Sequence, residues 1–224
     1  MSGASKRQLA KERLAYERAT LRALRPLVRG TAWGKRDNFV FRELEDTFFV
    51  AGLSVSRHGD KVAWRLGAKP MAVDPVFWSI MGMEENREQP LSFRGNGAFV
   101  CSEVPIATAE SLATSLPPDD MARAFLSWVD DSAGAFAGRS EQQTFSELVK
   151  SHESHRQHGA FAAMLISALI AEGDQKEALR VATDFASGAR STSFVQASDG
   201  KSFFELAESW LHSRTAGERP RGSG

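Results

Sequence analysis

The sequence predicts an α+β fold, in which an antiparallel four- to five-stranded sheet with an N-terminal helix is followed by a C-terminal helical bundle. Three observations support this prediction. Apolar residues recur at helical spacing before residue 30, they alternate with polar residues between 39 and 66, and helical spacing returns after Pro105. We therefore expect a helix-plus-sheet region over residues 1–106, a helical region over 107–214 and a disordered tail over 215–224.

The composition is typical of a folded globular chain, with 224 residues of which 42% are hydrophobic and 25% are charged. The longest mostly apolar run, residues 160–171, is too short to cross a bilayer. The N-terminus is polar and basic, unlike a secretory signal, so we expect a cytoplasmic protein without a membrane partner. Cys101 is the only cysteine, which excludes an intramolecular disulfide.

The first expected element is an amphipathic helix over residues 5–29. Its apolar stripe consists of Leu9, Leu14, Leu21, Leu24 and Val28. The other faces are mostly basic, and Gly30 is a typical helix stop.

Four strands are expected next, rich in β-branched and aromatic residues. They are marked by Phe39, Phe41 and Leu44; by Phe48, Val50, Leu53 and Val55; by Val62, Trp64 and Leu66; and by Leu91, Phe93, Phe99 and Val100. Short polar connections at 45–46 and 58–60 favour hairpins, and Gly95-Asn96-Gly97 is typical of a tight turn.

The stretch from Trp64 to Asn86 links the sheet to the helices. It begins as a strand, breaks at Pro70, turns at Asp74-Pro75 and continues as a short apolar helix.

Helices follow. Pro117 and Pro118 with Asp119 and Asp120 form a helix-start signal, because acidic residues favour the positive end of the helix dipole. Residues 132–140 are expected to form a joint, and further helices are expected over 141–155, 160–172, 175–187 and 201–212.

The helices expected over 160–172 and 175–187 together resemble a helical hairpin of tetratricopeptide type. The resemblance rests on Leu165, Gly173 and Ala178, and it departs from the pattern at Ala162 and Ala182, where an aromatic residue is expected. No second copy follows, and a solenoid needs about three repeats, so we expect a single helix pair.

The charges balance overall but are unevenly placed. Residues 1–36 carry ten Lys or Arg and two Glu, and residues 103–150 carry eight acidic and three basic residues. These segments face either each other or a partner. The zero net charge and the lack of interleaved aromatic residues in the basic helix disfavour nucleic-acid binding.

Two sets of residues are candidates for partner binding. One joins tryptophan and arginine, the usual anchors of protein interfaces, with an acid, and it consists of Trp64, Arg65, Asp74, Trp78 and Arg94. These residues also fit a core that contains an ion pair. The second set is acidic and consists of Asp119, Asp120, Asp130 and Asp131.

The remaining chemical groups give no catalytic, cofactor or metal prediction. His152, His155 and His158 are spaced three apart, whereas zinc sites on helices favour a spacing of four. Cys101 lies in an apolar context without a neighbouring base and is expected to be a small buried residue.

The layout of KPMAVDPVFWSIMGMEEN and SFRGNGAFV within residues 21–106 resembles uncharacterised bacterial domains of unknown function. That resemblance implies a small accessory or immunity-type protein. We therefore predict a non-enzymatic protein that binds another protein and neutralises a toxin by occlusion. Two other hypotheses stay open: an enzyme that binds a small molecule or nucleotide around Arg65, Asp74 and Arg94, and a nucleic-acid-binding protein that uses the first helix.

Overall fold

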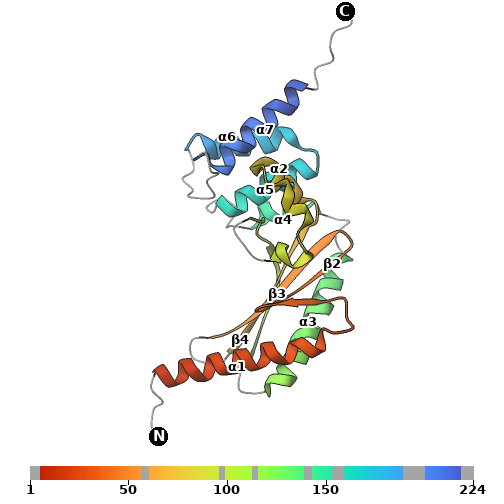
Figure 1. The fold of residues 1–224 in the computed structure, drawn as a ribbon, viewed down its shortest axis with the longest axis vertical. Coiled ribbons are helices and arrows are strands. Elements are labelled where there is room, and N and C mark those ends of the chain that lie inside the picture. The colour runs from red at the N-terminus through yellow and green to blue at the C-terminus, as the bar shows by residue number, and fades with distance from the viewer. Residues whose placement is uncertain are drawn as a thin grey trace, which may run out of the picture. The chain divides into compact units, whose positions relative to one another are not determined.

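The computed structural model describes residues 6–56, 61–95, 99–112, 116–138, 143–152, 159–188 and 200–217. It confirms the α+β class with an antiparallel sheet (Figure 1). The chain forms two compact units. Unit 1 combines Met1–Lys69 with Glu103–Gln142, and unit 2 combines Pro70–Ser102 with Gln143–Gly224.

Unit 1 contains a five-stranded sheet in which each strand pairs with the next along the chain. Its elements are α1 (Lys6–Leu27), β1 (Gly34–Arg36), β2 (Phe39–Leu44), β3 (Thr47–Val55), β4 (Lys61–Pro70), β5 (Val104–Leu112) and α3 (Pro118–Ala137). Pro70–Ser102 connects β4 to β5 and belongs to unit 2.

Alternation along the first part of β4 shows which sheet face lies under helices α1 and α3. In β4, Val62, Trp64 and Leu66 are buried. Lys61, just before Val62, and Arg65, between Trp64 and Leu66, are exposed. The buried side chains join Leu24 of α1 and Phe125 of α3, among others, in a single core. The two helices also pack against each other.

The β2–β3 hairpin has the expected polar turn. Glu45 and Asp46 both have positive φ, at 48° and 57°, and Leu44 pairs with Thr47. Positive φ at both central residues defines the turn type whose twist matches that of the flanking strands.

Unit 2 is helical. Its elements are α2 (Val73–Met81), two 3₁₀ helices η1 (Glu84–Glu88) and η2 (Leu91–Gly95), α4 (Phe145–Ser151), α5 (Gly159–Ala171), α6 (Gln175–Ala186) and α7 (Phe203–Gly217). Helix α5 is the most deeply buried of these, because nearly every position from Ala162 to Leu169 is apolar. It packs against α2, α4, α6 and α7.

Aromatic stacking closes the core of unit 2. Phe77 of α2 stacks on Phe203 of α7 with 5.1 Å between ring centroids, and Phe185 of α6 stacks on Phe204 at 4.7 Å. The expected helical hairpin α5–α6 is confirmed, with Gly173 at φ 86° in the turn and Asp174 capping α6.

The prediction of the last strand was wrong. Leu91–Gly95 is the 3₁₀ helix η2, Phe99 and Val100 lie outside any strand, and the fifth strand is Val104–Leu112. Alanine and glutamate are depleted in strands, and Thr108 is the only strand-favouring residue among 107–110, so this segment gives a weak strand signal in the sequence and is ordered by pairing with β4.

Further boundaries differ from expectation. Of the helix expected over 141–155, the described residues show only α4, Phe145–Ser151, which Thr144 caps and which ends before His152. The joint expected over 132–140 is absent up to residue 137, because α3 continues and buries Ala133 and Ala137. Helix α7 continues to Gly217, past the expected start of the tail at 215. The connection at 58–60, the pair Asn96-Gly97 and residues 218–224 lie outside the described residues.

Candidate functional site

The four candidate aspartates lie on one exposed side of α3. At about 100° per residue, Asp119, Asp120, Asp130 and Asp131 span an arc of about 120°, with the two pairs about 16 Å apart along the axis. Met121 and Phe125, which lie outside this arc, are buried in the core of unit 1. Helix α3 therefore presents an acidic face to solvent while its other side packs in the core of unit 1.

Only part of this acidic face is neutralised. Asp120 pairs with Arg123 at 2.7 Å on the same helix, and Asp130 pairs with Arg42 of β2 at 2.6 Å. Asp119 and Asp131 are exposed, and they have no ion-pair partner within the described part of the chain.

Asp130 is held more precisely than the other three. Its Oδ1 accepts a hydrogen bond from Arg42 Nη1 at 2.6 Å and another from Trp33 Nε1 at 3.0 Å. The Arg42 guanidinium also lies 5.7 Å from the centre of the Trp33 ring, within the range of a cation–π contact. The Asp130 side chain remains 58% exposed, so its second oxygen faces solvent as an oriented acceptor.

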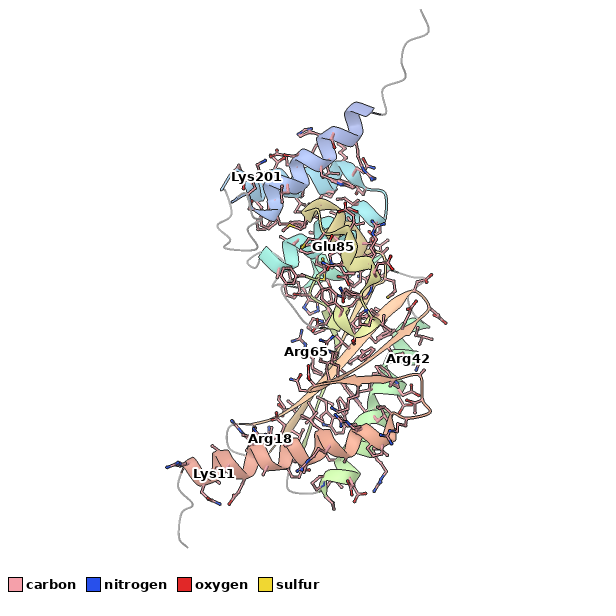
Figure 2. The ribbon with its side chains drawn as sticks, viewed as in Figure 1. Lys11, Arg18, Arg42, Arg65, Glu85 and Lys201 are labelled. Carbon is pink, nitrogen blue, oxygen red and sulfur yellow. The ribbon has the colours of Figure 1, made fainter. Side chains whose placement is uncertain are left out.

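Arg42 reaches Asp130 because of the strand register. Arg42 pairs across the sheet with Phe49, whose side chain belongs to the core that α1 and α3 cover. Arg42 therefore points to the helix-covered face, and its side chain is only 19% exposed. Figure 2 labels Arg42 in unit 1.

A pocket of about 480 Å³ lies beside this cluster. It is formed by the end of α1 and the segment after it, by β2 and by α3, and its lining combines apolar with charged side chains: Leu27, Thr31, Ala32, Trp33, Arg42, Arg123, Leu126, Ser127 and Asp130. We call this set the Trp33 pocket. Asp130 is the candidate acid that it contains.

The other candidate set is divided between the two units. Trp64 lies in the core of unit 1, where its ring is 5.9 Å from Phe125 and 5.6 Å from Trp128. Arg65 is half-exposed and pairs with Glu103 at 3.4 Å. Asp74, Trp78 and Arg94 belong to unit 2.

Within unit 2, Asp74, Trp78 and Arg94 do come together. Asp74 is fully buried; its Oδ1 accepts from the Cys101 amide at 2.9 Å, and its Oδ2 lies 3.4 Å from Arg94 Nη1. Arg94 also donates to the Met71 carbonyl at 2.8 Å and lies 5.1 Å from the centre of the Trp78 ring.

This arrangement is that of a structural ion pair. Trp78 is buried as well and donates from Nε1 to the Phe99 carbonyl. Through these contacts Asp74 and Trp78 fasten Arg94, Phe99 and Cys101 to α2. With Trp64, Asp74 and Trp78 buried, the expected Trp/Arg surface patch does not form, and the core interpretation fits these residues.

The remaining candidate groups have ordinary packing roles. Cys101 is buried, as expected, with its Sγ 3.8 Å from Ser167 Oγ. His152 lies 6.2 Å from the Phe161 ring, and His155 and His158 are outside the described residues. The described ranges contain no cluster of three His, Cys, Asp or Glu that is arranged to hold a metal ion.

Trp33 and Arg42 were not among the residues predicted from the sequence. Arg42 lies two residues after the buried Val40 in an expected strand and so shares its face, and a charged residue on a buried face is a recognisable signal. Trp33 gives no comparable signal, because its partner Asp130 is 97 residues away.

Comparisons of the chain with protein-family models, with curated proteins and with solved structures find no match. In the described part of the chain, no helix has both the length and the hydropathy needed to cross a membrane.

Proposed function

We propose that this chain is a non-enzymatic protein that binds another protein through the acidic face of α3, with the Trp33 pocket as the anchoring point. The observation that supports the proposal best is the geometry of Asp130. One carboxylate oxygen is fixed by Arg42 and Trp33, and the other is open to solvent. A preoriented acceptor binds a partner's donor with little loss of side-chain entropy.

The chemistry of the pocket specifies the kind of partner. A lysine or arginine from the partner would place its aliphatic stem against Leu27, Leu126 and the Trp33 ring. Its charged head would then reach Asp130. Asp119 and Asp131 would add longer-range attraction to a basic surface, which raises the association rate more than the affinity.

Binding of this kind acts by occlusion, since a basic surface covered by α3 is unavailable to other molecules. A toxin is the partner class that the resemblance to immunity-type domains implies, and that identity stays a prediction. It is tested by expressing the captured partner alone and together with this chain. Toxicity that this chain relieves supports the prediction, and a partner that is harmless alone contradicts it.

The first experiment is an affinity pull-down of the tagged protein from lysate of its own source, followed by affinity measurement with the dominant partner. Reversal of all four aspartates to lysine should weaken binding at least tenfold. Single exposed charges contribute about 0.2–1 kcal/mol each, and a central anchor contributes more.

The matched control reverses four exposed acids elsewhere, namely Glu45, Glu84, Glu85 and Glu88. It changes the net charge by the same amount and should leave the affinity within about twofold, since these residues lie outside the proposed interface. Equal loss in both variants, or no loss in the α3 variant, would remove the acidic face from the interface.

A small-molecule ligand is the second candidate, because the Trp33 pocket has a volume within the usual range of about 300–1,000 Å³ for ligand sites. A ligand that binds only the folded state raises the melting temperature by mass action. Small-molecule binding would be favoured over protein binding by two results together. A ligand raises the melting temperature of wild type but not of Trp33→Ala, and the pull-down yields no stoichiometric protein partner.

A further inference from the structure

Helix α1 carries a line of positive charge on the side opposite its buried face. Five basic residues project within an arc of about 60°, at spacings of four, seven, four and three positions. All five are exposed: Arg7, Lys11, Arg18, Arg22 and Arg25. We call this set the basic stripe, and Figure 2 labels two of its members, Lys11 and Arg18. Thr20 and Leu24, on the opposite side of the helix, are buried.

The stripe is straight and about 27 Å long, because a helix rises about 1.5 Å per residue. Both acidic residues of α1 lie off it. Glu17 accepts a hydrogen bond from the Val55 amide, and Glu12 accepts one from Gln8. The acidic residues of α1 therefore leave the stripe's charge intact.

The rest of the described chain does not neutralise the stripe either. In the described ranges none of its five residues forms an ion pair, and no ion pair joins α1 to α3. The two oppositely charged segments pack through their apolar sides and keep their charges outward.

The electrostatics at one end of the stripe agree with this picture. Burial lowers the pKa of Lys35, and the neighbouring Arg25 guanidinium lowers it further, although Asp37 raises it. Lys35 therefore lies close enough to Arg25, at the end of the stripe, for the two charges to interact, with the Asp37 carboxylate beside it.

The composition of the stripe distinguishes among anionic partners. A membrane-bound helix inserts a broad apolar face beside its basic residues, and a protein interface has an apolar centre. Leu14 is the only large apolar residue within or bordering this arc. Recognition here would rest almost entirely on charge, which is how proteins contact the phosphate backbone of nucleic acid.

A second copy of the chain is a poorer fit. The acidic face of α3 offers four carboxylates over about 16 Å, two of them already paired with Arg123 and Arg42, to five cations spread over about 27 Å. A duplex offers about eight phosphates per strand over 27 Å, at about 3.4 Å per phosphate.

We propose that the basic stripe of α1 binds the phosphodiester backbone of double-stranded nucleic acid without reading its sequence. The guanidinium groups form bidentate hydrogen bonds with phosphate oxygens, and the bound counterions are released. The site is on a different helix from the proposed protein-binding face and does not depend on it. The zero net charge of the chain disfavoured nucleic-acid binding in the sequence. That value sums the positive charge of the stripe with acidic residues elsewhere in the chain.

The test measures fluorescence anisotropy of two labelled 20-base-pair DNA duplexes of unrelated sequence, from 50 to 200 mM salt. With three to five phosphates contacted, the slope of log K against log salt should be about −3 to −4.5, a loss of about 60- to 500-fold over this range. The two duplexes should bind within about twofold of each other.

The diagnostic variant combines Lys11→Gln, Arg18→Gln and Arg22→Gln. Glutamine is a good helix former, so the helix is retained, which circular dichroism verifies. The slope of log K against log salt should become less negative by about 2 to 3, because each lost phosphate contact reduces its magnitude by about 1. The control combines Lys150→Gln, Lys176→Gln and Arg214→Gln, three exposed residues of unit 2, and should change affinity less than twofold.

Several results would overturn the proposal. These are absence of duplex binding at 50 mM salt, equal binding by the diagnostic variant, and equal affinity for poly-glutamate of matched charge. Binding to phosphatidylserine vesicles without duplex binding would assign the stripe to a membrane surface. A dimer that the same three substitutions dissociate would assign it to a second copy.

Discussion

Asp74 is the residue whose removal should reveal most about unit 2, because its carboxylate is fully buried and holds two segments together. Its Oδ1 accepts from the Cys101 amide at 2.9 Å, and its Oδ2 lies 3.4 Å from Arg94. Replacement by alanine leaves a buried amide without its acceptor and a guanidinium without its counter-charge.

The magnitude follows from these two contacts. A hydrogen bond to a charged group contributes about 1.5–3 kcal/mol. Arg94 is 13% exposed, its contact with Asp74 is long, and it keeps its bond to the Met71 carbonyl, so its share is smaller, about 1 kcal/mol. We expect Asp74→Ala to reduce the free energy of unfolding by about 2.5–4 kcal/mol. Asp74→Asn keeps an acceptor for Cys101 and should cost about 1–2 kcal/mol.

The assay is denaturant unfolding followed by tryptophan fluorescence, with hydrogen exchange to locate the change. Exchange should accelerate in α2 and at Cys101, because the fastening between them is lost, and should be unchanged in the sheet of unit 1. Asp131→Ala, at an exposed residue, is the control and should change stability by less than about 0.5 kcal/mol. If Asp74→Ala also stays within 0.5 kcal/mol of wild type, the Asp74 contacts do not stabilise unit 2.

Two further predictions concern local features. Replacing Glu45-Asp46 by Asn-Gly should raise the free energy of unfolding by about 0.5–1 kcal/mol, because both positions have positive φ, which asparagine and glycine adopt readily. Thermal unfolding measures the change in stability, and a less stable variant would contradict the turn assignment. Hydrogen bonding to Arg180 lowers the pKa of Glu177 below its ordinary value of 4.5, so this pair stabilises the fold above that pH and its contribution disappears as the pH falls through the lowered pKa. The pair is partly exposed, so the free energy of unfolding of wild type should exceed that of Glu177→Gln by no more than about 0.5 kcal/mol at pH 7. In strong acid the two free energies should be equal, and a difference that persists there would contradict the role of Glu177 ionisation.

Features that depend on neighbours in the sequence were predictable. The helical period and Gly30 defined α1 to within a few residues, since amphipathicity and the glycine stop are local properties. The polar pair at 45–46 identified the hairpin, and Gly173-Asp174 identified the turn between α5 and α6. The basic character of α1 was also visible, and helical geometry alone gathers its charges into one stripe.

Only the tertiary structure shows which strands pair and which distant side chains form contacts. Strand β5 is rich in small and polar residues, and it forms because β4 offers it a pairing edge. Asp130 meets Arg42 across 88 residues and Trp33 across 97, so no sequence window contains both the acid and its donors. The sequence left Asp74 and Trp78 as either partner-binding residues or parts of a core with an ion pair, and packing buries them.

Of the two proposed sites, one follows from local sequence and the other from long-range packing. The basic stripe follows from residue spacing on one helix, and the sequence determined it once that helix was recognised. The Trp33 pocket needs the end of α1, strand β2 and helix α3 to meet, and only long-range packing of the core brings them together. Spacing along a helix is fixed by backbone geometry, whereas contacts between distant segments depend on how the whole core is filled.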